Sequence, residues 1–197
     1  KVLDLENAEN PVSIRKNSEW YAHFGLKEIL ELTSRFTVQQ MLERDMFERR
    51  IKLERAVYVS EFLYPLLQGY DSVALDVDVE VGGTDQTFNM LVGRTLQKQV
   101  RNREKFVITT TLLTDWRTGK KLMAKSEGRF IALNDPPEEM FGKAMALPDE
   151  IILQILSDCT FVPLAEVNEM EENLAEGMNP RDAKFALAHA LVSLYHN

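Results

Sequence analysis

The sequence has little cysteine, no long apolar run and no excess of positive charge. Its one cysteine, Cys159, cannot form an internal disulfide, which favours a reducing, cytoplasmic location. No stretch approaches the roughly 18 consecutive apolar residues that a membrane-spanning helix needs, and no signal-peptide pattern is visible. A net charge of −8 argues against binding nucleic acid through bulk electrostatics, although it leaves room for a local basic patch.

Metal-ligand patterns and nucleophile motifs are also missing. His23, His189 and His196 are not spaced as metal ligands, either with one another or with Cys159, so we predict no protein-bound metal. What remains is an ordinary globular composition, with 45% hydrophobic and 27% charged residues. A length of 197 residues can hold one large or two small domains.

Helical periodicity dominates the first part of the chain. Apolar residues recur at spacings of three and four from Ser18 onward and predict two successive helices. The second ends in a run of charged side chains, which is typical of a solvated face, although a partner surface is the alternative. A further helix is predicted from Glu61 to about Leu75, with Ser60 as its N-cap.

The period then changes from helical to alternating. Valines alternate with acidic residues over 76–81 and predict a half-buried strand that stops at Gly82 and Gly83. A helix from Thr84 to about Val100 and a strand over 106–110 complete a βαβ unit, whose strands are parallel. Beyond residue 134 the chain is helical, with helix starts at Pro148 and at Asn179-Pro180. We therefore predict an α/β protein that is predominantly helical overall: a partial doubly wound (Rossmann-like) parallel sheet flanked by helical segments.

Two groups of polar residues follow the strands of this unit. Asp85 and Gln86 stand at the carboxyl end of the first strand, where open α/β sheets bind ligands; without them, the glycine pair would indicate only a tight turn. Lys120, Lys121 and Lys125 follow the second strand. They indicate either a solvated loop or cations that neutralise charge developing on a triphosphate.

A third polar group lies on the helix before the first strand. Tyr64, Gln68 and Asp71 are spaced by four and three residues and share one helical face. One interpretation is that Tyr64 packs and Asp71 caps the helix end. The other is a polar pocket for a small ligand, because such a face is costly to bury unless something hydrogen-bonds to it. Trp20 and Trp116 are interpreted as packing residues.

Together these motifs resemble the tyrosyl-tRNA synthetases, a family of class I aminoacyl-tRNA synthetases. The segment 64–71 (YPLLQGYD) is similar to the family's tyrosine-binding helix, and 82–89 (GGTDQTFN) to its nucleotide-binding turn. The segment 122–126 (LMAKS) is similar to its KMSKS loop. Residues 17–20 (NSEW) and 179–184 (NPRDAK) add to the resemblance, which covers nearly the whole chain.

The resemblance implies an enzyme that activates tyrosine with ATP to tyrosyl-adenylate and transfers it to tRNA. It implies ATP as a substrate, with Mg²⁺ accompanying it, and a cytoplasmic homodimer associated through connective helices. Tyrosine, ATP and tRNA would be the partners, with no membrane contact.

The resemblance also implies roles for individual residues. The amino and carboxylate groups of tyrosine would meet Tyr64, Gln68 and Gln86, with Asn17 at the pocket edge, and its phenol would meet Asp71. Gly83 and Asp85 would contact the ribose, and Leu113 the adenine. Lys125 would stabilise the pyrophosphate leaving group, and Lys121 is a candidate for the first loop lysine. As implied catalytic and binding residues we therefore list Asn17, Tyr64, Gln68, Asp71, Gly83, Asp85, Gln86, Leu113, Lys121 and Lys125.

The chain departs from the family pattern in two places. Leu122 and Ala124 replace the usual first lysine and serine of the loop motif, so the register of Lys121 is open. The family's HIGH motif is absent, so we expect the chain to be the second half of the catalytic region and to be inactive by itself. We accordingly predict a connective and dimerising segment at 1–59, the second half of the nucleotide-binding fold at 60–134, and a helical segment at 135–197.

Two other readings stay open. The related tryptophanyl-tRNA synthetases have a similar architecture, and a dimerisation module derived from a synthetase could have lost catalysis. A basic cluster is either a solvated surface or a local contact for tRNA; its members are Arg94, Lys98, Arg101, Arg103 and Lys105.

Overall fold

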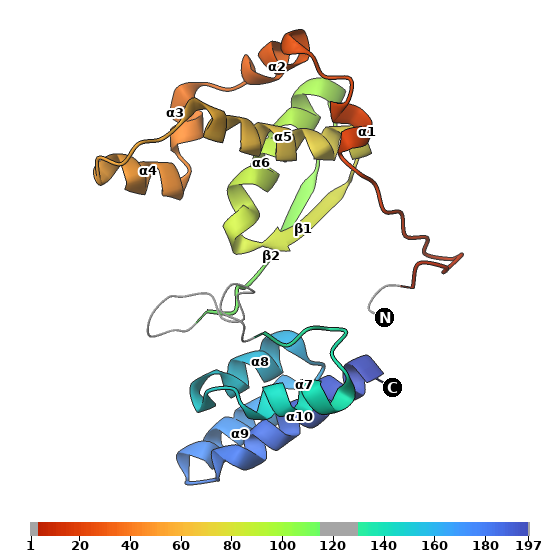
Figure 1. Cartoon of the computed structure of the whole chain (residues 1–197), viewed down its shortest axis with the longest axis vertical. Helices are drawn as coiled ribbons and strands as arrows, with labels where there is room; N and C mark the ends of the chain where they lie inside the picture. Colours follow the sequence, from red (N-terminus) through yellow and green to blue (C-terminus); the bar gives the residue numbers. More distant parts are fainter. Residues whose placement is uncertain (1–3, 115–129, 197) are drawn as a thin grey trace. The chain divides into compact units, whose positions relative to one another are not determined.

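The computed structural model describes residues 4–114 and 130–196 (Figure 1). The chain divides into two compact units. One, the α/β unit, spans Ile14–Thr111; the other, the helical unit, comprises Lys1–Ser13 and Leu112–Asn197. Each unit is described by itself. The three functional segments that the sequence suggests, 1–59, 60–134 and 135–197, stay a prediction.

The α/β unit begins with four short helices where the sequence predicts two. They are α1 (Ser18–Tyr21), α2 (Leu26–Thr33), α3 (Val38–Leu42) and α4 (Asp45–Lys52). The helical region breaks before α3 because Thr37 forms a capping box, in which its Oγ1 accepts from the Gln40 backbone N–H at 3.2 Å. The short helices leave much apolar surface uncovered, since Leu26 is 76% and Val38 61% exposed.

Helix α5 (Val59–Leu75) begins two residues earlier than predicted and ends where predicted. Its N-cap is Tyr58, whose backbone N–H donates to Glu61 Oε1 at 2.9 Å, so the glutamate caps the first turn from inside the helix. Its C-cap is Asp76, which adopts a left-handed conformation (φ 53°).

The predicted βαβ unit is confirmed. Strands β1 (Val79–Gly83) and β2 (Phe106–Thr110) are parallel, with Val79 opposite Phe106 and Gly83 opposite Thr110. Helix α6 (Thr87–Arg101) connects them and is preceded by a 3₁₀ turn, η1 (Thr84–Gln86), where the sequence predicts a continuous helix.

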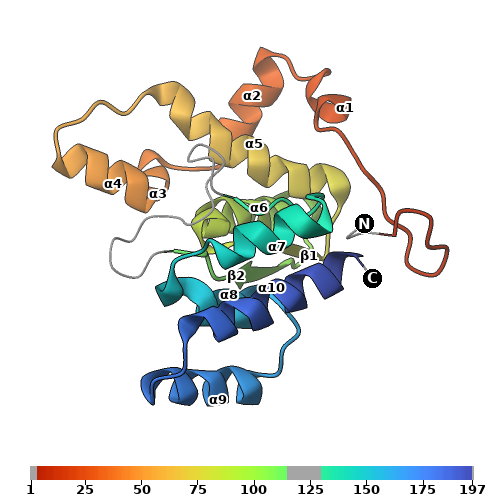
Figure 2. The same cartoon turned by 60° about the horizontal axis from the view of Figure 1, so that its bottom comes forward.

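The two faces of this sheet differ. Helices α5 and α6 lie side by side near the strands (Figures 1 and 2), and Glu80 points from β1 toward Ser72 of α5. Alternate strand residues point to the opposite face, where large apolar side chains remain 45–67% exposed. These are Val79, Val81, Phe106 and Ile108, which we call the open sheet face.

A buried ammonium group ties four elements of the α/β unit together. Lys105, only 1% exposed, donates from Nζ to Ser72 Oγ of α5 (2.8 Å), to the Met90 carbonyl of α6 (3.1 Å) and to Glu80 of β1. Lys105 itself directly precedes β2, which is the fourth element. All three ammonium donors are therefore satisfied. Lys105 thus belongs to neither a solvated surface nor a tRNA contact, the two alternatives considered for the basic cluster.

Helices α5 and α6 cross in close contact at two glycines, which makes room for this ammonium. A Cβ added at Gly93 would lie 2.6 Å from Lys105 Nζ and 2.7 Å from Ser72 Oγ. A Cβ added at Gly69 would lie 2.7 Å from Val92 Cγ1 and 2.9 Å from the Gly93 backbone nitrogen. Neither helix can carry a larger residue here without moving its neighbour.

The helical unit contains α7 (Pro137–Met145), the 3₁₀ turn η3 (Asp149–Ile151), α8 (Ile152–Cys159), α9 (Leu164–Ala175) and α10 (Pro180–His196). Helix α10 packs along α7 and α8, and α9 along α8 (Figure 1). The predicted start of the last helix is confirmed, because Asn179 Oδ1 accepts from the Arg181 backbone N–H at 3.0 Å. A continuous apolar core results, with Ile152, Ile155 and Leu187 at or near zero exposure.

Candidate functional site

The polar face of α5 is only partly buried. Gln68 and Asp71 are half-buried, whereas Tyr64, one turn earlier, is 62% exposed. Asp71 is oriented by a donor from outside the helix, because the Trp20 indole N–H of α1 donates to Asp71 Oδ1 at 2.9 Å. This bond holds the carboxylate in position beside the Tyr21 hydroxyl, and a carboxylate has lone pairs for further donors.

The sequence interpretation of Trp20 as a packing residue missed this hydrogen bond. The neighbouring Tyr21 contributes to the same cluster: its hydroxyl donates to the Leu67 carbonyl, and its ring packs edge-on against Phe24 at 5.1 Å. Burial, and next the Asp71 carboxylate, raise the pKa of the Tyr21 hydroxyl. A half-buried indole usually needs an acceptor for its N–H, and this requirement could have indicated a polar partner for Trp20 from the sequence.

The turn after β1 places polar groups at the carboxyl end of a parallel strand. Gly82 packs against α6, since a Cβ there would lie 3.0 Å from Met90 Sδ. Gly83 ends β1, Asp85 is exposed on η1, and Gln86 is half-buried. This arrangement brings backbone and a carboxylate to the edge of the sheet where open α/β folds bind ligands.

Asn89 joins the two polar groups. It lies on α6, is 1% exposed, and donates from Nδ2 to Gln68 Oε1 of α5 at 2.8 Å and to Gln86 Oε1 of η1 at 3.1 Å. The helix face with Gln68 and Asp71 and the turn with Gln86 therefore form one connected region. The sequence motif contained Asn89 but did not indicate this bridging role.

The remaining implied site residues are Asn17, Leu113, Lys121 and Lys125. Asn17 is exposed at the N-terminus of α1 and makes no side-chain cap. Leu113 belongs to the helical unit, where it packs on that unit's core. Lys121 and Lys125, with the rest of the lysine-rich loop, lie outside the described residues.

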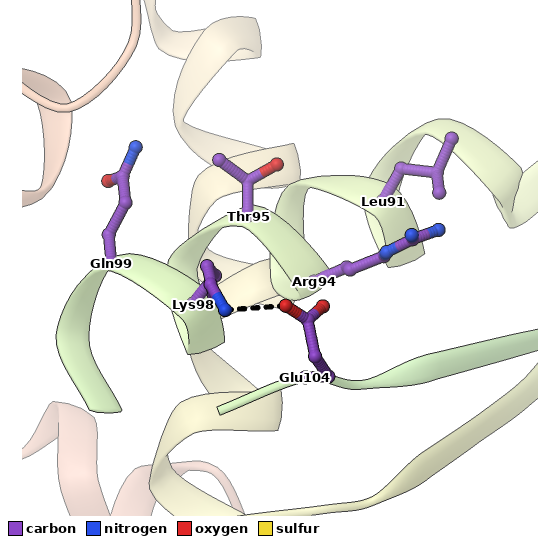
Figure 3. A pocket seen from close by; sticks show the side chains of 6 residues that line it. All are labelled: Leu91, Arg94, Thr95, Lys98, Gln99 and Glu104. Carbon is purple, nitrogen blue, oxygen red and sulfur yellow. Dashed lines mark ion pairs between the residues drawn. The ribbon is translucent and has the colours of Figure 1, made fainter. Parts of the chain in front are cut away.

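Arg94 and Lys98 of α6 line an open pocket of about 540 Å³ (Figure 3). Within it Lys98 forms an ion pair with Glu104 at 2.6 Å, beside Arg94. Arg101 donates to the Val73 carbonyl, and Arg103 pairs with Asp76 at 2.8 Å. Much of the predicted basic cluster is thus neutralised by acidic partners within the α/β unit.

The described residues contain neither a metal-binding cluster nor a membrane span. Within 4–114 and 130–196, no group of three or more His, Cys, Asp or Glu side chains is arranged to hold a metal ion. No helix in the same ranges combines the length and apolarity needed to cross a bilayer.

Comparison with known proteins identifies the family. The model of class I tRNA synthetases (W and Y) matches residues 1–197. Tyrosine–tRNA ligase of Haemophilus ducreyi is 44% identical over 197 residues, which is 100% of this chain and 48% of that protein. The ligase of Carboxydothermus hydrogenoformans is 46% identical over 182 residues, or 92% of this chain and 44% of that protein.

Solved structures agree with the sequence relatives. A C-terminally truncated mitochondrial tyrosyl-tRNA synthetase of Coccidioides posadasii superposes with a TM-score of 0.63 at 27% identity, covering 91% of this chain and 53% of that one. The predicted resemblance and the Rossmann-like fold class are thereby confirmed. The chain spans about half the length of the curated relatives it matches. It belongs to the class I tRNA synthetase family that comprises the tryptophan and tyrosine enzymes.

Proposed function

We propose that this chain is the second half of the catalytic region of a cytoplasmic tyrosine–tRNA ligase. The whole enzyme would activate tyrosine with ATP and transfer it from tyrosyl-adenylate to tRNA. Its curated relatives support tyrosine over tryptophan, because the ligases matched at 44–46% identity are named for tyrosine.

The observation that carries the proposal is the orientation of Asp71. Trp20 donates to one of its oxygens at 2.9 Å, and the carboxylate so held would accept the phenol of a bound tyrosine with a remaining lone pair. Phenylalanine would leave that acceptor desolvated and unpaired, at a cost of about 1–3 kcal/mol. The amino and carboxylate groups of tyrosine would then contact Gln68 and Gln86, with Tyr64 and Asn17 nearer the entrance.

The nucleotide would occupy the turn after β1. In this proposal Gly83 and Asp85 contact the ribose, since a carboxylate accepts from ribose hydroxyls where the backbone comes close. Leu113 would contact the adenine, Lys125 the departing pyrophosphate, and Lys121 is the candidate for the other loop lysine. Mg²⁺ would arrive bound to ATP.

Two exposed apolar surfaces fit a chain that functions within a larger assembly. The open sheet face would be covered by the remainder of the catalytic fold, because apolar strand residues exposed by 45–67% stay in water otherwise. The short helices α2 to α4 would form the homodimer contact, and Leu26, Leu30 and Val38 on them are 58–76% exposed.

The catalytic proposal is tested with a chimera in which this chain replaces the matching region of the Haemophilus ducreyi ligase. We expect tyrosine-dependent exchange of pyrophosphate into ATP from the chimera and none from the chain alone. Asp71→Asn should lower kcat/KM for tyrosine by at least about tenfold and for phenylalanine much less. An unchanged tyrosine-to-phenylalanine ratio, or a folded chimera that binds no tyrosine, would contradict the proposal.

Association is measured separately by sedimentation of the chain. A purely monomeric state at micromolar concentration would contradict the proposal that α2 to α4 form the dimer contact.

A further inference from the structure

The buried ammonium of Lys105 bonds to the immediate sequence neighbours of residues in the candidate site. Its Nζ donates at 2.8 Å to Oγ of Ser72, which directly follows Asp71 on α5. It also donates at 3.1 Å to the carbonyl of Met90, which directly follows Asn89 on α6. Asn89 in turn connects α5 with η1 through its side chain. One charged group is therefore bonded directly beneath both the polar face of α5 and its link to the turn.

The third partner lies on the strand that leads into this turn. Glu80 accepts from Lys105 Nζ and, at 3.0 Å, from the Ser72 hydroxyl, and it stands three residues before Gly83, where β1 ends. Because a strand is nearly extended, fixing Glu80 also fixes where along the strand the turn begins. The ammonium, hydroxyl and carboxylate thus form a closed set of three charge-assisted hydrogen bonds between α5, β1 and the start of β2.

Stability alone does not account for a lysine at this position. A buried ion pair often adds no net stability over apolar residues of similar volume, because both charges lose their water. Apolar contacts are not directional, whereas an ammonium hydrogen-bonds only where its acceptors lie at about 3 Å and in line with its protons. What Lys105 adds is a defined relative position of the segments that it bonds.

We propose that Lys105 is a positioning residue for adenylate formation, because it fixes α5, which carries the amino-acid site, relative to the turn after β1, which carries the nucleotide site. The assignment of the two sites rests on the proposed function, whereas the alignment of α5 with the turn does not.

The chemical step depends on this alignment. A carboxylate oxygen of tyrosine bonds to the α-phosphorus of ATP while the bond from that phosphorus to the bridging oxygen breaks. Pyrophosphate leaves with the electron pair of the broken bond, and no proton is transferred. A displacement of about 1 Å between reacting groups can lower such a rate by about 10²-fold. Each substrate would still meet its own half of the site, so loss of Lys105 should affect kcat more than either KM.

Two variants separate position from stability. Lys105→Met removes every hydrogen bond of the ammonium. The double variant Lys105→Met, Glu80→Met also removes the carboxylate left without its ion-pair partner, so it should recover most of the lost stability without restoring the directed bonds. The matched control is Gln97→Ala, which removes another fully buried polar side chain of α6, bonded to Asp76 at 2.9 Å.

The first measurement is NMR of the 197-residue chain without any ligand. The Asn89 amide protons donate to Gln68 at 2.8 Å and to Gln86 at 3.1 Å, so nuclear Overhauser effects from these protons to the two glutamine side chains report the alignment of α5 with η1. We expect these effects to weaken in Lys105→Met and in the double variant, and to persist in Gln97→Ala.

The second measurement is exchange of pyrophosphate into ATP by the chimera with the Haemophilus ducreyi ligase. In the double variant kcat should fall at least about tenfold, while the KM values for tyrosine and ATP stay within about threefold of those of the unsubstituted chimera. Gln97→Ala should keep kcat within about threefold.

The outcomes distinguish this inference from the proposed function. Unchanged Overhauser effects in the double variant, or a kcat that returns together with stability, would overturn the role of Lys105. Raised KM values at an unchanged kcat, or an equal loss of kcat in Gln97→Ala, would overturn it as well. If the Overhauser effects weaken but the unsubstituted chimera exchanges no pyrophosphate, the proposed function fails and the alignment by Lys105 stands.

Discussion

The two units of this chain differ in the polarity of their buried residues. Among the described residues of the helical unit, the buried ones are apolar except for Asp135, and the core is built from Ile, Leu, Val, Ala and Met. In the α/β unit, Ser72, Asn89, Gln97 and Lys105 are buried beside apolar residues. Buried polar groups cost stability unless they are hydrogen-bonded. The hydrogen bonds of these side chains therefore fix the relative positions of the helices and strands of the α/β unit.

The exposed surfaces differ in the same way. In the α/β unit, the open sheet face and apolar residues of α2 to α4 are exposed to solvent, whereas the charged side chain of Lys105 is buried. Large exposed apolar surfaces are typical of interaction sites, which fits the proposed larger assembly. This contrast leads to three predictions about stability, from the largest effect to the smallest.

Removing the buried ammonium should have the largest effect. Lys105→Met removes the ammonium that donates to Ser72 and leaves Glu80 with only the Ser72 hydroxyl as a donor among the described residues, and breaking a buried ion pair from one side costs about 3–5 kcal/mol. We expect the lower end, because Glu80 is 23% exposed and water reaches it. Amide hydrogen exchange should accelerate in β1 and β2 and remain unchanged in α10.

The control for this variant is Lys98→Met on the same unit. It removes an ion pair whose partners are 53% and 60% exposed, and such pairs contribute about 0–1 kcal/mol. Recovery of most of the stability in a Lys105→Met, Glu80→Met double variant would support the assigned pair. Equal effects of Lys105→Met and Lys98→Met would refute it.

Replacing a glycine by alanine should destabilise the α/β unit at one position and stabilise the helical unit at another. Gly69→Ala pushes α5 against the Gly93 backbone nitrogen, only 2.9 Å from the new Cβ, and overpacking of this kind costs about 1–3 kcal/mol. Gly142→Ala in α7 meets nothing within 4 Å and should stabilise the helix by about 0.5–1 kcal/mol. Urea unfolding of each variant measures both, and the same sign for the two would contradict the close helix crossing.

Local pattern was enough to predict α5, both strands and α10, but not the division of the N-terminal region into four helices or the pairing of distant residues. The alternation of Val77, Val79 and Val81 predicted β1, and Asn179-Pro180 predicted the start of α10, because burial period and capping are encoded by neighbours. The polar face of α5 was also readable from its spacing. The family resemblance added the roles of these residues, which spacing alone does not supply.

Pairings across the fold were missed for a physical reason. The hydrogen bond from Trp20 to Asp71 joins residues 51 positions apart, and no local pattern encodes it. A lysine ordinarily indicates a solvated position, so Lys105 was assigned to a surface. It is buried because Gly69 and Gly93 let two helices approach closely, and that crossing exists only in the folded structure. The motif at 82–89 contains Asn89, but its hydrogen bonds to Gln68 and Gln86 depend on how α5 and η1 pack in the fold.

The smallest of the three effects concerns Asp135, an acidic residue buried in the helical unit, and it depends on pH. The Lys143 ammonium, at 2.8 Å from Asp135 Oδ2, and the backbone N–H of Ala132 hold the pKa of the Asp135 carboxyl below its usual value of 3.8. A carboxyl with a lowered folded pKa stabilises the fold above its unfolded pKa, and this contribution disappears as the pH falls through the folded pKa. Asp135→Asn should therefore lower the urea midpoint at pH 7, with the difference from wild type shrinking below about pH 4. Glu169→Gln, on the exposed side of α9, should show no such pH-dependent difference. A difference for Asp135→Asn that stays constant from pH 7 to pH 3 would mean that the ionised carboxylate does not stabilise this unit.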